Sequence, residues 1–463
     1  MSARDLELGA WRRLAGRPGG KLVMPSHHLL THGVAVGMTG SGKTGLLFVM
    51  VEEALRSGVP VLMIDLKGDL PNLTLAFEHF GHEPLLPWAE SLMAPNDARS
   101  IEAVAKELAA NRQRGLTGWG ITQEHLSHYR TSTHVRVLTP GSSAGERVHL
   151  LSALERPSAH WTDDREAARQ SLSAAISLLL RLVGRDADPA RSKEHVLLSV
   201  LAERRLVAHQ PADLKSLIQD LLEPPITDVG ALPVDGFVSS AQRGALAAAL
   251  NALLVAPSFS SWRDGTSLDV GQWMTGSEAR TPAVVFSVAH LEGEERALVL
   301  GLLLDEMLSW VRSLPGTRRL RALVVIDEVF GLLPPHPANP PTKAPIVSLL
   351  KQARAYGVGL MLATQNPMDL DYRALSNAGL WCIGRLQADA DRARVIDGLS
   401  LSASGSGSTK QLHHTVKKLA KRWFVMRDVH DEIGVRLFQP RWAMSFMRGP
   451  MTRAEIRRAV AER

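Results

Sequence analysis

The chain has 463 residues, 45% of them hydrophobic and 22% charged, and 53 lysines and arginines against 47 acidic residues give a net charge of +6. This length exceeds what one compact core usually holds, so we expect more than one lobe, and the modest charge only mildly favours an anionic polymer as partner. The sequence contains no apolar run that could cross a bilayer, no signal-peptide segment at its start and only one cysteine, Cys382. We therefore expect a cytoplasmic protein with no membrane partner and no intramolecular disulfide.

A glycine-rich segment near the start of the chain carries the clearest chemical signal. The apolar run 33–36 predicts a short buried strand, and residues 44–56 have apolar positions at helical spacing. Between them, Gly37-Met38-Thr39-Gly40-Ser41-Gly42-Lys43-Thr44 is a complete phosphate-binding loop (P-loop) pattern. The predicted strand before the glycine-rich turn and the predicted helix after it argue against the alternative, a turn that matches the pattern by chance.

The chemistry of this loop predicts the ligands and their contacts. Backbone N–H groups and the positive end of the helix would bind a polyphosphate. Lys43 would bind the β- and γ-phosphates, and the Thr44 hydroxyl would bind Mg²⁺, so we expect ATP and magnesium. The predicted nucleotide contacts are Gly37, Thr39, Gly40, Ser41, Gly42, Lys43, Thr44 and Gly45.

Strands and helices alternate at both ends of the chain. Apolar runs predict strands at 60–65, 135–139, 282–288, 321–327, 357–364 and 380–386. Between about 158 and 257 helical periodicity dominates, which indicates an insertion. We therefore predict an α/β fold with a mainly parallel sheet and an inserted α-helical subdomain. The predicted division is a lead segment 1–30, a discontinuous core 31–155 and 280–446, a helical insertion 156–279 and a basic tail 447–463.

A second signature lies at 323–328, where four branched apolar residues precede Asp327 and Glu328. A buried strand of this kind presents its carboxylates at the edge of the sheet where ligands bind. Asp327 would hold the magnesium ion, and Glu328 fits a base that polarises the attacking water. The alternative is an ordinary strand that ends in two acidic residues. The P-loop in the same chain makes this alternative the weaker one.

A third apolar strand, 358–364, leads to Gln365. This side chain would either contact the γ-phosphate and orient the water or merely cap the end of its strand. The sequence of this stretch leaves the two interpretations open.

Several segments together carry a family resemblance. They are 31–33, 64–70, 286–291, 326–331, 351–357, 363–367, 376–379, 384–386 and 441–443. In these segments the chain resembles the HerA/FtsK superfamily of RecA-like ATPases and is closest to the bacterial HerA-like helicases. The resemblance implies a RecA-like core, a catalytic glutamate at Glu328, a sensor glutamine at Gln365, a homohexameric ring and double-stranded DNA as partner.

In such a ring the nucleotide lies between subunits, and a neighbour supplies positive charge to the transition state. The resemblance points to two candidates for this role, Arg354 before the sensor strand and Arg385 at the end of the strand 380–383. A surface ion pair is the alternative for each.

The C-terminal region is basic. Leu412, Val416 and Leu419 form the apolar stripe of a predicted helix. Basic residues lie on that helix and in the tail: Lys410, Lys417, Lys418, Lys421, Arg422, Arg448, Arg453, Arg457, Arg458 and Arg463. They indicate either a surface that contacts phosphates or a neighbouring subunit's site, or an ordinary solvated helix face.

The sequence as a whole predicts a magnesium-dependent ATPase motor that acts on DNA as a translocase or helicase. A second hypothesis is an assembly ATPase, whose nucleotide-gated ring organises a protein partner such as a nuclease or a defence effector. A kinase is the third hypothesis, and Glu328 argues against it because phosphate transfer to a bound hydroxyl does not need that carboxylate.

Overall fold

The computed structural model describes residues 5–14, 18–94, 96–155, 161, 165–276, 280–367, 370–375, 378–400 and 409–461. The chain divides into two compact units, the first made of residues 1–137, 272–290 and 314–463 and the second of residues 138–271 and 291–313. Among the described residues, no helix has the length and apolar character needed to cross a membrane.

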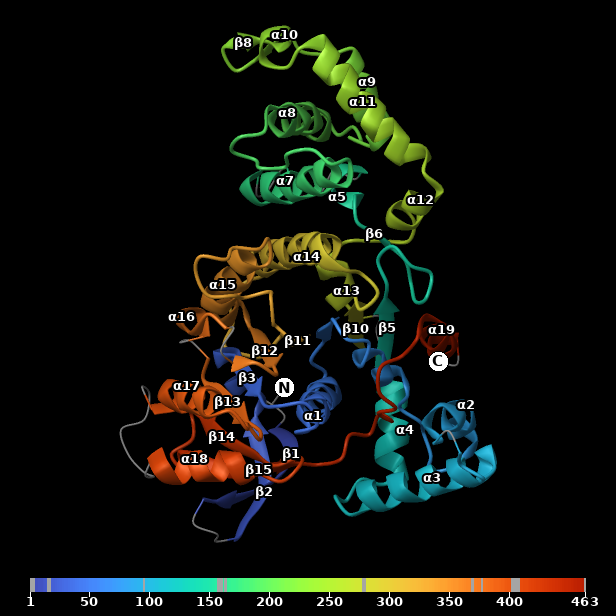
Figure 1. The fold of residues 1–463 in the computed structure, drawn as a ribbon, viewed down its shortest axis with the longest axis vertical. Helices are drawn as coiled ribbons and strands as arrows, with labels where there is room; N and C mark the ends of the chain where they lie inside the picture. Colours follow the sequence, from blue (N-terminus) through green and yellow to red (C-terminus); the bar gives the residue numbers. More distant parts are fainter. Residues whose placement is uncertain are drawn as a thin grey trace. The chain divides into compact units, whose positions relative to one another are not determined.

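The first unit is built on one large sheet, whose described strands follow the order β2-β1-β15-β14-β13-β3-β12-β11-β4-β10-β5 (Figure 1). The strands from β13 to β10 in this order run parallel. The strands β2, β1, β15 and β14 extend the sheet with antiparallel pairings. The strands are β1 (Asp5–Arg13), β2 (Pro18–Pro25), β3 (Gly33–Val36), β4 (Val61–Asp65), β5 (Thr133–Leu138), β10 (Thr281–Ser287), β11 (Ala322–Asp327), β12 (Val358–Thr364), β13 (Leu380–Ile383), β14 (Phe424–Asp428) and β15 (Val435–Pro440).

The central strands are buried over their whole length, as in β4, β11 and β12. Near-continuous apolar sequence is what a parallel sheet covered on both faces requires. The parallel register also aligns the strand ends, because Asp327 pairs with Asp65 and Thr364 pairs with Val36. We call the side where these strands end the carboxyl edge, and the side where they begin the amino edge. The predicted α/β class with a mainly parallel sheet is confirmed.

Helices and short 3₁₀ turns connect these strands. The helices of the first unit are α1 (Lys43–Arg56), α2 (Leu86–Ala89), α3 (Ile101–Thr117), α4 (Gln123–Ser132), α15 (Lys343–Gln352), α16 (Tyr372–Leu375), α17 (Asp389–Ser400), α18 (Thr409–Lys418) and α19 (Arg453–Ala461). The 3₁₀ turns are η1 (Ser26–Thr31), η2 (Leu70–Thr74), η3 (Glu83–Leu85), η4 (Glu90–Leu92) and η5 (Ala353–Tyr356).

A buried ion-pair cluster joins α1 to the segment after β15. Arg441 bonds Glu52 at 2.9 Å and Glu53 at 2.8 Å, and each of the three side chains is at most 4% exposed. Glu52 also accepts the backbone N–H groups of Met444 and Ser445, each at 2.9 Å. The buried charges are therefore paired and hydrogen-bonded, as their desolvation demands.

The second unit is mainly helical. Its helix α9 packs along α11, and α7 packs against α8 and α14 (Figure 1). Hydrogen-bonding caps begin several helices; for example, the Asp213 side chain accepts the Ser216 N–H at 2.7 Å before α9. The helices are α5 (Ser152–Glu155), α7 (Arg165–Leu182), α8 (Lys193–Val207), α9 (Leu214–Leu222), α10 (Val234–Phe237), α11 (Ser240–Val255), α12 (Pro257–Arg263) and α14 (Gly293–Ser313). Two short strand pairs join β6 (Val148–His149) to β9 (Thr266–Ser267) and β7 (Asp228–Val229) to β8 (Leu232–Pro233), and α13 (Val270–Met274) follows β9.

The units and the predicted segments have different bounds. The predicted lead segment, 1–30, supplies β1, β2 and most of η1 to the first unit. The second unit takes in most of the predicted insertion and adds α14 to it. Residue 156, where the predicted insertion begins, lies outside the described residues.

The basic helix near the C-terminus ends earlier than the sequence predicts. Its last residue is Lys418, so the expectation that Lys421 and Arg422 continue it is wrong. Arg422 has a backbone φ of 65°, and its N–H donates to the Ser41 carbonyl at 2.8 Å. This contact takes the backbone away from a helical path. Arg463, the last predicted basic residue, lies outside the described residues.

Candidate nucleotide-binding site

The glycine-rich segment forms a tight loop between β3 and α1. Gly40 has φ 76° and Gly42 has φ 102°, a region of backbone conformation that favours glycine. A Cβ atom on Gly42 would also lie 3.0 Å from the Arg422 side chain. The helix α1 begins directly after the loop, at Lys43. Its N-terminus therefore faces the space that the loop encloses, as anion binding requires.

The Lys43 side chain bonds the backbone of its own loop. Its ammonium group donates to the Gly37 carbonyl and, at 3.2 Å, to the Met38 carbonyl. Burial, and then the charge of Lys67, lowers the pKa of Lys43 to about 8. An ammonium group has three N–H donors, so the same side chain retains one donor for a phosphate oxygen.

Three carboxylates gather at the carboxyl edge, next to the loop. Asp65 accepts from Ser287 Oγ at 2.7 Å and from the Gly68 N–H at 2.8 Å, and its pKa is raised by burial. Asp327 is 2% exposed. Burial and the nearby Asp65, Asp69 and Glu328 raise the pKa of Asp327 to about 6, against the opposing charge of Lys67.

Glu328 is held in place from three directions. Its Oε1 accepts from Thr364 Oγ1 at 2.9 Å and from the Gln365 N–H at 3.3 Å, while its Oε2 pairs with Lys67 Nζ at 2.7 Å. Burial alone would raise the pKa of Glu328, but the hydrogen bond and charge of Lys67 bring it below the ordinary value. Its backbone φ is 78°, a conformation rare outside glycine, and such residues are concentrated at functional sites.

Gln365 connects this carboxylate to the loop. The Thr39 hydroxyl donates to the Gln365 side-chain oxygen, and the Gly37 N–H donates to the Thr364 carbonyl at 3.3 Å. Of the two interpretations that the sequence leaves open, this contact favours a side chain directed at the loop over a strand cap. The predicted residues Thr39, Asp327, Glu328 and Gln365 thus lie around one space.

The two candidate arginines lie at opposite edges of the sheet. The Arg385 carbonyl accepts the Met38 N–H at 3.0 Å, and Arg385 Nε lies 3.4 Å from Met38 Sδ, so this residue is beside the loop of its own chain. Arg354 is in η5, before the start of β12. The seven residues of β12 place it about 20 Å from Gln365.

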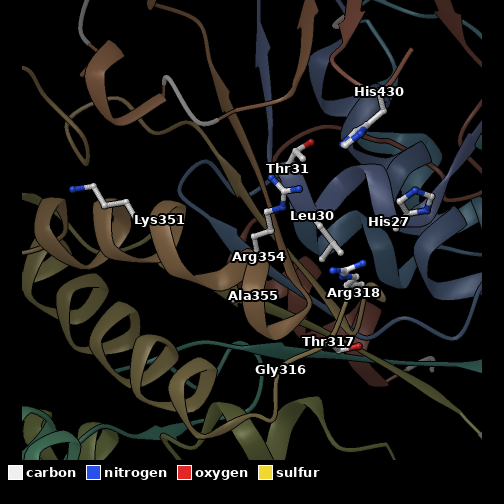
Figure 2. Close-up of a pocket in the computed structure, with 10 residues that line it drawn as sticks. All are labelled: His27, Leu30, Thr31, Gly316, Thr317, Arg318, Lys351, Arg354, Ala355 and His430. Carbon is white, nitrogen blue, oxygen red and sulfur yellow. The ribbon is translucent and has the colours of Figure 1, made fainter. Parts of the chain in front are cut away.

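Arg354 lines a pocket of 810 Å³ at the amino edge (Figure 2). Residues from four separate segments line the same pocket, among them Thr31, Arg318, Lys351 and His430. This pocket is rich in cationic and titratable side chains. Because Arg354 lies about 20 Å from Gln365, at the other edge of the sheet, it cannot reach the P-loop of its own chain.

The chemistry of the site fits a magnesium ion. Asp327 Oδ2 is buried and has no hydrogen-bond partner among the described residues, and a buried carboxylate oxygen without a partner is costly unless a cation binds it. The hydroxyl of Thr44, in the first turn of α1, is the second oxygen donor. Carboxylate and hydroxyl oxygens are the ligands that Mg²⁺ prefers.

Comparisons with known proteins bear on the family and the fold of the chain. Residues 12–82 match the model of the family described as "Helicase HerA-like C-terminal". The structure of VirB4 of Thermoanaerobacter pseudethanolicus matches with a TM-score of 0.51 and 14% identity, over 96% of this chain and 97% of that one. The resemblance to the HerA/FtsK superfamily is confirmed. The fold of the chain is that of its RecA-like P-loop ATPases.

A further structure, the plasmid coupling protein TrwB in complex with ADP and Mg²⁺, matches with a TM-score of 0.48 and 14% identity, over 97% of this chain and 92% of that one. Among curated proteins, none matches the chain in sequence.

Within this HerA/FtsK-like site, sequence reasoning did not assign a role to Lys67 or Thr364. Both contact Glu328 directly. Lys67 stands in the segment Asp65-Leu66-Lys67-Gly68-Asp69, whose polar residues directly follow a buried strand. That position was the available signal, because side chains that follow parallel strands meet at one edge of the sheet.

Proposed function

We propose that this chain is a magnesium-dependent ATPase whose copies assemble into a homohexameric ring in the cytoplasm, and that the ring moves double-stranded DNA. The observation that carries the proposal is the position of the Glu328 carboxylate. Thr364, Gln365 and Lys67 hold its carboxylate beside the P-loop and next to the buried Asp327. A carboxylate at this place can orient the attacking water and accept a proton from it.

Each residue then has a defined role in hydrolysis. The loop N–H groups and Lys43 would bind the triphosphate, and Glu328 would accept a proton from the attacking water. Gln365, held by the Thr39 hydroxyl, would orient that water or contact the γ-phosphate. Thr44 and Asp327 would hold Mg²⁺, which supplies positive charge to the phosphate oxygens.

The positions of the two arginines support a ring. Because Arg354 lies at the amino edge, it would act on nucleotide bound at the carboxyl edge of a neighbour. A head-to-tail contact between different edges of identical subunits closes into a ring when the rotation permits it. Arg385 is beside the loop of its own chain and would act within the same subunit.

Exposed lysines support a nucleic-acid partner. On α18, Leu412 and Val416 are buried, while Lys410, Lys417 and Lys418 are exposed. In the tail, Arg448 pairs with Glu455 and Arg458 donates to the Pro87 carbonyl at 2.8 Å, so these two arginines already have partners within the chain. The α18 lysines are therefore the stronger candidates for phosphate contacts.

The deciding experiment measures ATP turnover with and without double-stranded DNA over a range of salt concentrations. DNA should stimulate turnover, and the stimulation should decline as salt rises because phosphate contacts release counterions. The triple variant Lys410→Glu, Lys417→Glu, Lys418→Glu should keep basal turnover but lose the stimulation, and Lys43→Ala controls for contaminating ATPases. If the protein hydrolysed ATP but DNA did not change the rate at any salt concentration, the assembly ATPase would be favoured instead.

A further inference from the structure

The turn that follows Glu328 presents an aromatic side chain to solvent. The Leu332 N–H donates to the Val329 carbonyl at 3.0 Å, and Gly331 has φ 77°, a value that type II turns require of their third residue. Val329 is 0% exposed and Leu332 is 6% exposed, whereas Phe330 is 55% exposed. Phe330 therefore stands at the apex of a turn whose two end residues are buried.

Hydrogen bonds on both sides hold this turn in place. The Val329 N–H donates to the Ala363 carbonyl of β12 at 2.8 Å. The hydroxyl of the buried Thr342 donates to the Leu332 carbonyl, also at 2.8 Å. An aromatic side chain on a fixed turn loses little conformational freedom when it binds a partner, and aromatic residues are enriched in protein interfaces. Phe330 is thus a preformed anchor at the carboxyl edge.

The amino-edge pocket has the lining that an aromatic anchor needs. It combines the nearly buried Leu30 with Thr317, Ala355 and the exposed Arg318. Guanidinium groups bind the faces of aromatic rings. The Lys351 side chain points away from the other labelled side chains (Figure 2). Among the described residues that line this pocket, none is acidic.

The proposed ring brings the turn and the pocket together. In that ring, Arg354 of one subunit acts beside Glu328 of the next. Phe330 follows Glu328 by two residues, a distance of at most about 7 Å along the chain. Phe330 therefore comes within reach of the pocket that Arg354 lines. The carboxylates of one edge and the guanidinium groups of the other also have opposite charge, which favours this pairing of edges.

We propose that Phe330 of one subunit inserts into the amino-edge pocket of the next, against Leu30, Thr317 and Arg318. The occupant of the pocket is thus a second copy of this chain. The Arg318 guanidinium lies over the face of the phenyl ring, and Arg354 remains available for the nucleotide. The inference rests on the proposed function, because it assumes a ring in which different edges of identical chains meet.

Cysteine cross-linking tests the contact. The parental chain has one cysteine, Cys382, and it is buried, so the introduced thiols determine which disulfides form. Protein that carries both Phe330→Cys and Thr317→Cys should give a ladder of linked multimers when oxidised with ATP and Mg²⁺. Within one chain the six residues of β11 separate the two positions by roughly 20 Å, whereas a disulfide spans at most about 7 Å between Cα atoms. Each such disulfide must therefore join two subunits.

A second pair and two controls define the site. Phe330→Cys with Ala355→Cys places the second thiol elsewhere in the same pocket and should also give the ladder. Phe330→Cys alone should not, because it lacks the partner thiol. Phe330→Cys with Leu92→Cys should not give it either, since Leu92 is 40% exposed but does not line the pocket.

Sedimentation with ATP and Mg²⁺ measures what the contact contributes. Phe330→Ala should raise the protein concentration needed for assembly about tenfold, as expected for the loss of an aromatic anchor, and Phe330→Tyr should preserve most of the assembly. Arg318→Ala should weaken assembly severalfold in the parental protein but add little to Phe330→Ala, because the two side chains contact each other. Its control is Arg319→Ala, an exposed neighbour that does not line the pocket and should have no effect. Thermal melting confirms that each variant is folded.

The outcomes separate this inference from the proposed function. If the parental protein stayed monomeric with ATP and Mg²⁺, the proposed ring itself would fail. If the parental ring formed but neither cysteine pair gave the ladder, the docking of Phe330 would be refuted while the ring remained. Assembly of Phe330→Ala at the parental concentration would refute it as well.

Discussion

The two edges of the parallel sheet have opposite chemistry. The carboxyl edge holds Asp65, Asp327 and Glu328 around the P-loop. The amino edge holds a pocket lined by Arg318, Arg354 and histidines. One chain therefore carries a cluster of carboxylates at one edge and a group of arginine and histidine side chains at the other. In the proposed ring, a complete site would combine the carboxyl edge of one subunit with the amino edge of the next.

The largest expected effect comes from the amino edge. Arg354→Ala should spare ATP binding but lower turnover by about 10³–10⁵, the range reported for arginines that act on phosphoryl transfer from a neighbour. Co-expression with Glu328→Gln subunits should restore part of the activity, because a mixed interface can combine the intact arginine of one subunit with the intact glutamate of the other. Steady-state turnover of the purified mixed assembly measures this.

Arg385→Ala is the matched comparison. Arg385 lies beside its own loop, so its variant should not be complemented by Glu328→Gln subunits, because every site in the mixed assembly would still lack either its arginine or its glutamate. Sedimentation in the presence of ATP and Mg²⁺ should show an assembly, and a strictly monomeric protein would contradict the trans role of Arg354.

At the carboxyl edge, Glu328→Gln keeps the shape of the side chain but removes the carboxylate that accepts a proton. Turnover should fall by about 10²–10⁴, the usual contribution of general-base catalysis, with ATP affinity nearly unchanged. Rapid-quench kinetics should locate the loss in the hydrolysis step. If this variant hydrolysed ATP at the parental rate, the general base would have to be another residue, and Asp65 and Asp69 would be the first candidates.

A smaller effect should follow from Lys67→Met, which removes the ion pair that holds Glu328 at 2.7 Å. The loss of a charged hydrogen bond should lower kcat by roughly tenfold with little change in KM, because Lys67 positions Glu328 and the loop residues bind the nucleotide. Lys106→Met is the control, since Lys106 is 58% exposed and pairs with Glu102 on the same helix. A rise in KM alone would assign Lys67 to nucleotide binding.

A last expected effect concerns the stability of the amino edge rather than turnover. Burial, and the charge of Arg354, lowers the pKa of His32 to about 4, and His32 Nδ1 accepts the Leu360 N–H at 3.1 Å. Because the folded-state pKa lies below the unfolded value of 6.5, the neutral ring stabilises the fold above pH 6.5. About 2–3 kcal/mol of that stability should be lost as pH falls to 4.

His32→Asn should flatten this dependence. The asparagine side chain does not titrate in this range, and its oxygen can accept the Leu360 N–H that His32 accepts. Urea denaturation of both proteins at pH 7 and pH 4.5 measures the difference. Equal pH dependence in the two proteins would exclude His32 as its source.

The sequence predicted the elements around the P-loop better than the contacts between segments that are far apart in the chain. The P-loop, Asp327, Glu328 and Gln365 each follow a strongly apolar strand, so local patterns and the parallel rule predict both their elements and their proximity. The contact between Arg422 and Ser41 joins residues far apart in the chain, and nothing in the local pattern around Arg422 indicates that the helix ends at Lys418. The pairing of β1 with β15 is equally remote in sequence. Such contacts depend on tertiary packing, which periodicity does not encode.

The buried cluster of Arg441 with Glu52 and Glu53 has a consequence for how this sequence can vary. Replacing Arg441 leaves the buried Glu52 without its cationic partner, which typically costs about 3–5 kcal/mol. Replacing the whole set with well-packed apolar residues is often neutral. Single exchanges at these positions should therefore be selected against in homologous chains, which should either keep the arginine and both glutamates or lose all three.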